Sequence, residues 1–163
     1  MKTEKENKWA YPSFQEWTWK SYDGTKDIEL NAFLEKNKEE LVEFYIGTDS
    51  QTYGKKCTMT TVLIAYKRGK GGNIIVHIQK LPSFENLRQR LLGEAMRSLE
   101  TAWYVSPKIK KNTVVIHLDV NADLKFRSGQ YKDELVGLIM SQGFDCTYKP
   151  NSWASSKVAD SKC

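Results

Sequence analysis

The chain has 163 residues, a formal net charge of +5 at pH 7 and an isoelectric point near 9.0. This length fits one domain with a buried core, and the positive charge favours a polyanionic partner, although many modestly basic proteins never bind nucleic acid. No run approaches the roughly 18 apolar residues of a membrane span, and the charged residues 1–8 precede no apolar segment of signal-peptide length. We therefore expect a cytoplasmic protein.

The N-terminal part of the sequence predicts an extension followed by the main domain. We place the boundary between an aromatic-rich extension at 1–25 and a domain at 26–163. Aromatic side chains gather in the extension, and we expect them to cap the core: Trp9, Tyr11, Phe14, Trp17 and Trp19. Asp27 is expected to cap a helix whose apolar residues recur with helical spacing up to Lys36.

Three β-strands are predicted in the next part of the chain. Residues 41–46 are mainly β-branched and aromatic and stop at Gly47, as a buried strand followed by a turn would. Residues 58–66 and 74–78 form two further runs, joined by the basic, glycine-rich segment KRGKGGN, which is typical of an antiparallel connection. A three-stranded antiparallel meander is therefore expected.

Helices and strands then alternate. Residues 84–103 carry apolar side chains with a period near 3.6, which predicts the longest helix, and Pro82-Ser83 supplies a start signal. After a polar loop at 106–112, residues 113–120 form an apolar run typical of a parallel strand covered on both faces. A helix at 131–140, a strand at 144–149 and a final short helix complete an α/β order with a mixed sheet.

The cysteines and histidines do not form a recognisable disulfide framework or metal-binding motif. Cys57, Cys146 and Cys163 include no C-x-x-C pair, so reduced thiols are expected. His77 and His117 belong to no closely spaced ligand set, and we assign them no catalytic role. Any bound metal should therefore have oxygen ligands.

Acidic residues at four distant positions form the candidate site: Asp49, Glu94, Asp119 and Asp160. Asp119 closes an apolar strand, where open α/β sheets place ligand-binding groups, and Glu94 borders the buried face of the long helix. Ordinary alternatives exist, because Asp49 can cap a turn, Asp119 can cap the next segment, and Asp160 can be a surface residue. Glu94 is different, since unpaired burial of a carboxylate is costly and a cation should meet it.

As a group, the four acidic residues suggest a site for divalent cations. Hard divalent cations such as Mg²⁺ prefer carboxylate oxygens and water as ligands. Carboxylates from several segments that converge in space can bind two such cations and hydrolyse a phosphodiester bond. Only the tertiary fold could bring these residues together, because they are far apart in the sequence.

Four segments carry a resemblance to a known family: YIGTDSQ at 45–51, LRQRLLGEAMRSLETA at 87–102, VVIHLDVN at 114–121 and KPNSWASSKVAD at 149–160. In this ordered series, the chain resembles the bacterial ribonuclease H-like family typified by the YkuK protein, from roughly Lys26 onward. The resemblance implies an α/β ribonuclease H-like fold over 26–163. Its sheet would be mixed and five-stranded, with the first three strands antiparallel and helices flanking it.

The resemblance also implies a site for two Mg²⁺ or Mn²⁺ ions. Asp49 would bridge both cations, while Glu94 and Asp119 would complete one side. Asp160 would hold the other cation. These roles would make the protein a metal-dependent nuclease that acts on RNA, or on an RNA-containing duplex such as an RNA/DNA hybrid, by a two-metal mechanism.

A non-catalytic module that keeps the fold and binds nucleic acid or a protein is the alternative function. The basic segments 67–72 and 108–111 could grip phosphates, and aromatic side chains could stack on bases: Trp9, Tyr11, Trp17 and Trp19. Core packing and solubility are the ordinary explanations for these features. Lys149, Lys157 and Arg127 are candidate phosphate contacts, with solvated surface charge as the alternative. A purely structural or oligomer-building role ranks last, because it leaves the four acids unexplained.

Overall fold

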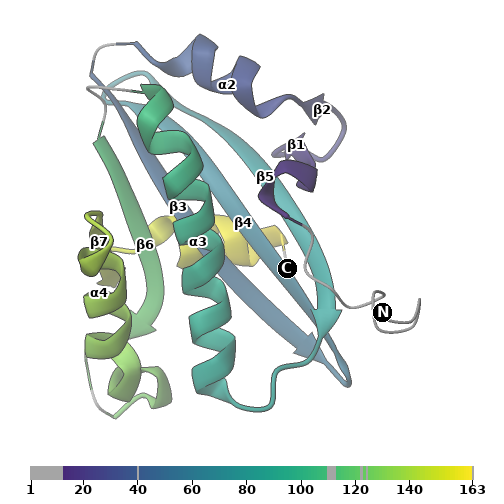
Figure 1. Cartoon of the computed structure of the whole chain (residues 1–163), viewed down its shortest axis with the longest axis vertical. Helices are drawn as coiled ribbons and strands as arrows, with labels where there is room; N and C mark the ends of the chain where they lie inside the picture. Colours follow the sequence, from purple (N-terminus) through teal and green to yellow (C-terminus); the bar gives the residue numbers. More distant parts are fainter. Residues whose placement is uncertain (1–12, 40, 110–112, 122, 124, 163) are drawn as a thin grey trace.

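A computed structural model describes residues 13–39, 41–109, 113–121, 123 and 125–162, except for the side chains of 155–157. Its centre is one mixed sheet with strand order β2-β1-β5-β4-β3-β6-β7 (Figure 1). The strands are β1 (Trp19–Ser21), β2 (Asp27–Ile28), β3 (Val42–Tyr53), β4 (Lys56–Lys67), β5 (Gly71–Pro82), β6 (Thr113–Asn121) and β7 (Asp145–Lys149). β3, β4 and β5 form the expected antiparallel meander, while β6 lies parallel to β3 and β7 parallel to β6.

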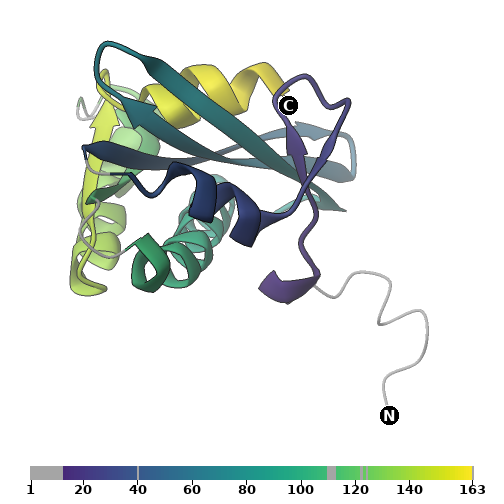
Figure 2. The ribbon, with the colours of Figure 1, turned by 90° about the horizontal axis from the view of Figure 1, so that it is seen from above.

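Helices cover the two faces of the sheet unequally (Figure 2). On one face lie α2 (Leu30–Asn37), α3 (Leu87–Ile109) and α4 (Lys132–Ser141). The other face carries the C-terminal segment, which consists of the π-helical turn η3 (Ala154–Ala159) and the 3₁₀ turn η4 (Asp160–Lys162). Two more 3₁₀ turns are η1 (Phe14–Glu16) and η2 (Arg127–Tyr131).

The alternation of side chains along the strands produces two separate buried clusters. On β4, Leu63 packs in the cluster beneath the helices, while Val62 and Ile64 pack in the cluster beneath the C-terminal segment. Because successive strand residues point to opposite faces, a strand covered on both sides needs apolar residues at consecutive positions. This double coverage explains the uninterrupted apolar run of β4.

The described residues form a sheet of seven strands, so the expected number of five was wrong. The row β5-β4-β3-β6-β7 corresponds to the five expected strands, and β1 and β2 extend it beyond β5. β1 has three residues and β2 has two, which is too short for an alternating pattern to be recognised. The division between 1–25 and 26–163 stays a prediction.

The cap of α2 was also predicted wrongly. Asp27 lies in β2, where its carboxylate pairs with the Lys20 ammonium at 3.0 Å. The helix is capped by Glu29, whose two carboxylate oxygens accept the amide hydrogens of Asn31 and Ala32 at 3.0 and 2.6 Å. Glutamate is not among the preferred capping residues, so the sequence pattern favoured the aspartate.

Two elements continue beyond their predicted ends. β3 does not stop at Gly47 but runs to Tyr53, so the interpretation of Asp49 as a turn residue was wrong. α3 begins after Asn86, whose side chain accepts the amide hydrogen of Gln89 at 2.9 Å, and it extends to the buried Ile109. Part of the loop expected at 106–112 is therefore helix, and 110–112 lie outside the described residues.

The N-terminal aromatic residues that are described cap the core as expected. Trp17 and Trp19 are only 7% and 3% exposed, and Phe14 packs against the same cluster. The Trp17 ring stacks on His77, with ring centroids 4.2 Å apart. Base stacking by Trp17 or Trp19 is therefore the wrong interpretation, while Trp9 and Tyr11 lie outside the described residues.

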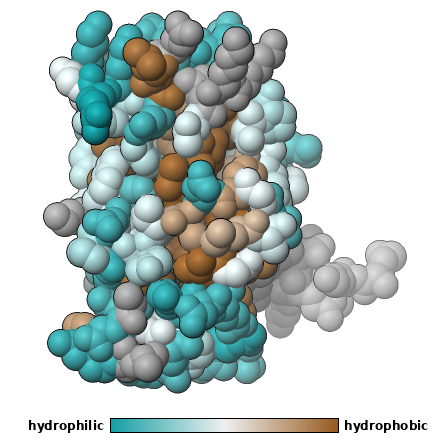
Figure 3. Space-filling model, turned by 90° about the vertical axis from the view of Figure 1, so that its left-hand side faces the viewer, coloured by the Kyte–Doolittle hydropathy of each residue, from teal (hydrophilic) through white to brown (hydrophobic). Residues whose placement is uncertain are grey.

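The side of the molecule formed by β7 and α4 shows apolar surface in its middle and polar surface toward its ends (Figure 3). Among the described strands, β7 stands last in the sheet order, next to β6. Within the described part of the chain, every helix falls short of the length and apolar character that a membrane crossing requires.

Candidate metal centre

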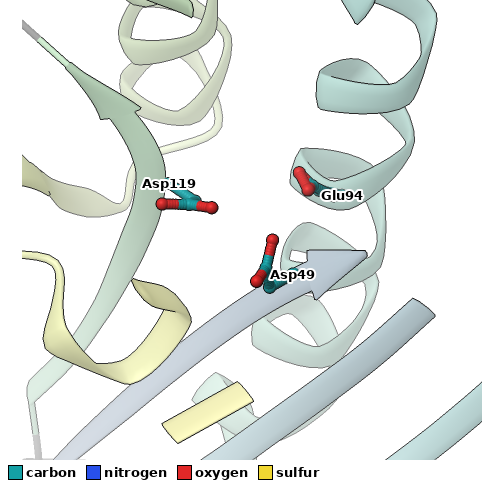
Figure 4. A group of neighbouring side chains, drawn as sticks. All are labelled: Asp49, Glu94 and Asp119. Atoms are coloured by element: carbon teal, nitrogen blue, oxygen red, sulfur yellow. The ribbon is translucent and has the colours of Figure 1, made fainter. Parts of the chain in front are cut away.

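Three carboxylates from distant parts of the chain lie close together in the fold (Figure 4). Asp49 comes from β3, Glu94 from α3 and Asp119 from β6. One oxygen atom of each residue lies within 4.8 Å of the others. The structure therefore brings together three of the four acidic residues that the sequence singled out.

The parallel pairing of β3 and β6 explains why two of the aspartates meet. Their last register pair joins Gly47 and His117, and each aspartate follows its member of that pair by two residues. Residues two apart on a strand point to the same face, so Asp49 and Asp119 lie at equivalent positions on neighbouring strands. Both strands continue past the point where their pairing ends, and the Glu94 carboxylate approaches there from α3.

The Glu94 carboxylate is buried with one oxygen atom unpaired, which favours binding of a cation. Its side chain is only 6% exposed, and Oε1 accepts a hydrogen bond from the Ser50 hydroxyl at 3.2 Å. Oε2 is buried and has no hydrogen-bond partner among the described residues. A buried carboxylate oxygen without a partner is costly, so this atom suits a metal ligand.

Burial and mutual repulsion raise the pKa values in the cluster. Desolvation raises the pKa of Glu94 well above its ordinary value, and the charges of Asp49 and Asp119 add to this effect. The pKa of Asp49 is raised to about 8, mainly by desolvation, then by the Asp119 charge and by hydrogen bonds with Asp160 and Asp119. A divalent cation among these oxygens would relieve both effects, because it favours the charged carboxylates.

Asp160 lies beside the cluster on the side of the C-terminal segment. It begins η4 and is exposed to solvent, and its side chain takes part in a hydrogen bond with Asp49. The Thr60 hydroxyl of β4 donates to the carbonyl oxygen of Lys162 at 3.4 Å, which ties η4 to the sheet. Asp160 is thus adjacent to Asp49, outside the group of three whose oxygens lie closest together.

Two neighbours of the cluster had roles that the sequence did not indicate. Ser50 donates to Glu94, although nothing in the local pattern distinguishes it from a turn serine. Lys149 was a candidate phosphate contact, and its ammonium lies 2.7 Å from Oδ1 of Asp119. Arg127 is exposed on η2, and the side chain of Lys157 lies outside the described residues.

The composition of the cluster fits a hard divalent cation. All three groups offer carboxylate oxygens, which Mg²⁺ and Mn²⁺ prefer. A cavity of about 780 Å³ lies elsewhere, between η1, β1, β2, α2 and Tyr104 of α3, and none of the clustered carboxylates lines it. The chemistry of the donor atoms, and not the size of a cavity, therefore identifies this cluster as the candidate site.

Comparisons with known proteins yield a family-profile match over most of the chain. No curated protein matches the chain. The crystal structure of RNase H1 from the halophilic archaeon Halobacterium salinarum NRC-1 aligns at 12% identity over 75% of this chain and 98% of that chain, with a TM-score of 0.39. The profile of the family described as Ribonuclease H-like matches residues 27–163. The chain therefore belongs to the Ribonuclease H-like family.

Proposed function

We propose that this protein is a metal-dependent nuclease that hydrolyses phosphodiester bonds in RNA or in an RNA-containing duplex such as an RNA/DNA hybrid. The convergence of Asp49, Glu94 and Asp119, with one bare buried oxygen on Glu94, is the observation that carries the proposal. Family membership supports the reaction class, and the net charge of +5 favours a polyanionic substrate. A closer relation to the YkuK-type branch and a cytoplasmic location belong to the same proposal.

The four acids would hold two Mg²⁺ or Mn²⁺ ions, with Asp49 shared, Glu94 and Asp119 on one side and Asp160 on the other. When bound, such cations lower the pKa of the attacking water and stabilise the leaving 3′-oxygen. Asp49 and Glu94 supply negative charge at fixed, buried positions. Asp49 is held within β3, where it pairs with Thr60 of β4, and Glu94 is oriented by Ser50. Carboxylates positioned in this way need little rearrangement to bind a cation.

A substrate panel tests the proposal. Labelled single-stranded RNA, double-stranded RNA, RNA/DNA hybrid, single-stranded DNA and double-stranded DNA are incubated with the protein in Mg²⁺, Mn²⁺ or EDTA. We expect metal-dependent cleavage of an RNA-containing substrate, and a loss of at least about 100-fold in Asp49→Asn, since it removes a preorganised charge of the reaction centre. Asp27→Asn is the matched control, because the Asp27 side chain is 88% exposed and belongs to β2.

Two results of the substrate panel would count against the nuclease. Equal residual cleavage by the wild type and Asp49→Asn would show that a contaminating nuclease makes the products. Salt-dependent nucleic-acid binding that survives Asp49→Asn, without cleavage in either metal, would contradict the nuclease and favour the binding module.

A further inference from the structure

Lys149 brings a positive charge to the carboxylate cluster. It is the last residue of β7, and its ammonium lies 2.7 Å from Oδ1 of Asp119. The Lys149 and Asp119 side chains are 35% and 17% exposed, and Asp119 is half-buried whereas Asp49 and Glu94 are buried. Lys149 therefore reaches the member of the cluster that is nearest to solvent, and the described residues offer it no second ion pair.

The register of the sheet creates this contact. On β6, His117 pairs with Thr147 of β7, and the next recorded pair joins Asn121 to Lys149. Three residues of β6, 118–120, therefore lie opposite one residue of β7, and Asp119 is the middle one of this bulge. Bulges re-aim side chains and are frequent near functional sites. The bulge in β6 and the end of β7 bring the Asp119 carboxylate and the Lys149 ammonium together.

The contact is an electrostatic one that another cation can replace. Oδ1 of Asp119 is buried and receives no hydrogen bond of ordinary geometry from a described residue, despite the short distance to Lys149. The ammonium is a compact charge on a flexible four-carbon stem, so it can leave without disturbing the backbone. A divalent cation would need the same carboxylate, and charge repulsion would disfavour both cations beside it.

We propose that Lys149 is a built-in counterion that competes with the divalent cation for Asp119. In the metal-free protein the ammonium offsets part of the negative charge of the cluster. When a cation binds, the ammonium is displaced toward solvent, so Lys149 raises the cation concentration that the site needs. This inference rests on the proposed function, because it presupposes that the cluster binds a cation.

Calorimetric titration with Mn²⁺ alone tests the competition in three full-length proteins: the wild type, Lys149→Gln and Lys132→Gln. Lys132 is a matched control on the same side of the molecule, since its ammonium lies 4.9 Å from the centre of the Tyr148 ring and pairs with Asp133. Removing either lysine changes the net charge equally, but only Lys149 contacts the cluster. We expect Lys149→Gln to bind Mn²⁺ about fivefold more tightly or better, and Lys132→Gln to stay within about twofold of the wild type.

A spectroscopic measurement on the wild type follows the displacement of the ammonium itself. The lysine ammonium ¹⁵N resonances are recorded before and after addition of Mg²⁺, and the Lys149 resonance is assigned by its absence from Lys149→Gln, or by selective comparison with Lys149→Arg. We expect the Lys149 resonance to shift when Mg²⁺ binds, while the Lys132 resonance stays in place.

The outcomes separate this inference from the function on which it rests. Mn²⁺ binding by the wild type, with Lys149→Gln no tighter than Lys132→Gln, overturns the competition and leaves the metal site intact. Absence of binding in all three proteins overturns the metal site and the competition together. Binding by Lys149→Gln alone supports the competition in its strongest form.

Discussion

The backbone N–H of Ala154 donates a buried hydrogen bond of 3.0 Å to Nδ1 of His117. His117 lies on β6 two residues before Asp119, and Ala154 begins η3, which leads to Asp160. This bond therefore fastens the segment that carries the fourth acidic residue to the strand that carries the third. The rings of Tyr45 and Trp153 pack around the same imidazole.

Replacing His117 by Phe should loosen the C-terminal segment. The ring is kept but the acceptor is lost, which leaves the Ala154 amide unpaired and should lower the free energy of unfolding by about 1–3 kcal/mol. We expect faster hydrogen exchange at the Ala154 amide and weaker nuclease activity, because Asp160 is less firmly held. Tyr66→Phe is the control, since it keeps a ring beside Trp153. Unchanged Ala154 exchange in His117→Phe would contradict this role.

Asp49→Asn should stabilise the metal-free protein while it removes activity. The substitution keeps the shape of the side chain and relieves repulsion with Asp119 and Glu94. In EDTA at pH 8, we expect the free energy of unfolding to rise by about 1–3 kcal/mol, a typical range for a single substitution with a defined cause. Urea unfolding measures the change, with Asp27→Asn as control. A variant less stable than the wild type would show that these charges do not strain the fold.

His77 should make stability depend on pH below neutrality. Desolvation lowers the pKa of His77 to about 4 from an ordinary value of 6.5, and its Nδ1–H donates to the carbonyl oxygen of Thr18 at 2.7 Å. Because the folded pKa is the lower one, the contribution of the neutral ring is fully present above pH 6.5 and is lost as pH falls toward 4. The full contribution is on the order of 3 kcal/mol.

The variant His77→Phe tests this pH dependence. It keeps a ring to stack on Trp17 but leaves the Thr18 carbonyl oxygen unpaired, so at pH 7 it should be less stable than the wild type by about 1 kcal/mol. At pH 5 the difference in the free energy of unfolding should vanish or reverse. Only the wild type is destabilised at this pH, because its buried imidazole stays neutral while the unfolded chain binds a proton. Equal differences in the free energy of unfolding at the two pH values would contradict the assignment.

Trp19→Ala should destabilise the whole fold, not only the N-terminus. The Trp19 side chain is 3% exposed, and its strand pairs with β5 in the central sheet. Truncating a buried tryptophan typically lowers the free energy of unfolding by about 3–5 kcal/mol. Tyr22→Ala is the control, because Tyr22 is 39% exposed. We expect a lower midpoint of chemical denaturation at a probe on α3. An unchanged midpoint would show that the N-terminal strand unfolds independently of the rest of the fold.

The elements that the sequence predicted well are those whose signal is local. The parallel strand β6 follows from its apolar run, and α3 from its helical period, because both patterns arise from burial of the element itself. The continuation of β3 has a different origin. Thr48 and Ser50 are polar residues that become buried only because α3 lies over them, with 2.8 Å between the hydroxyls of Thr48 and Ser98. No local pattern reveals such a contact.

The candidate site shows the same limit. Each acidic residue has an ordinary local explanation, and their meeting depends on the parallel register of β3 and β6 and on the packing of α3. The family resemblance indicated the four acidic residues, whereas the contacts of Ser50 and Lys149 with them became visible only in the structure. The contact between Lys149 and Asp119 depends on a bulge, which sequence spacing does not disclose.

An anomalous difference map from crystals soaked in Mn²⁺ tests the central claim most directly. We expect manganese peaks at coordination distance, about 2.0–2.4 Å, from oxygens of Asp49, Glu94 and Asp119, with a second peak roughly 4 Å away on the side of Asp160. Crystals in which the three carboxylates turn away from one another, with no manganese between them, would contradict it.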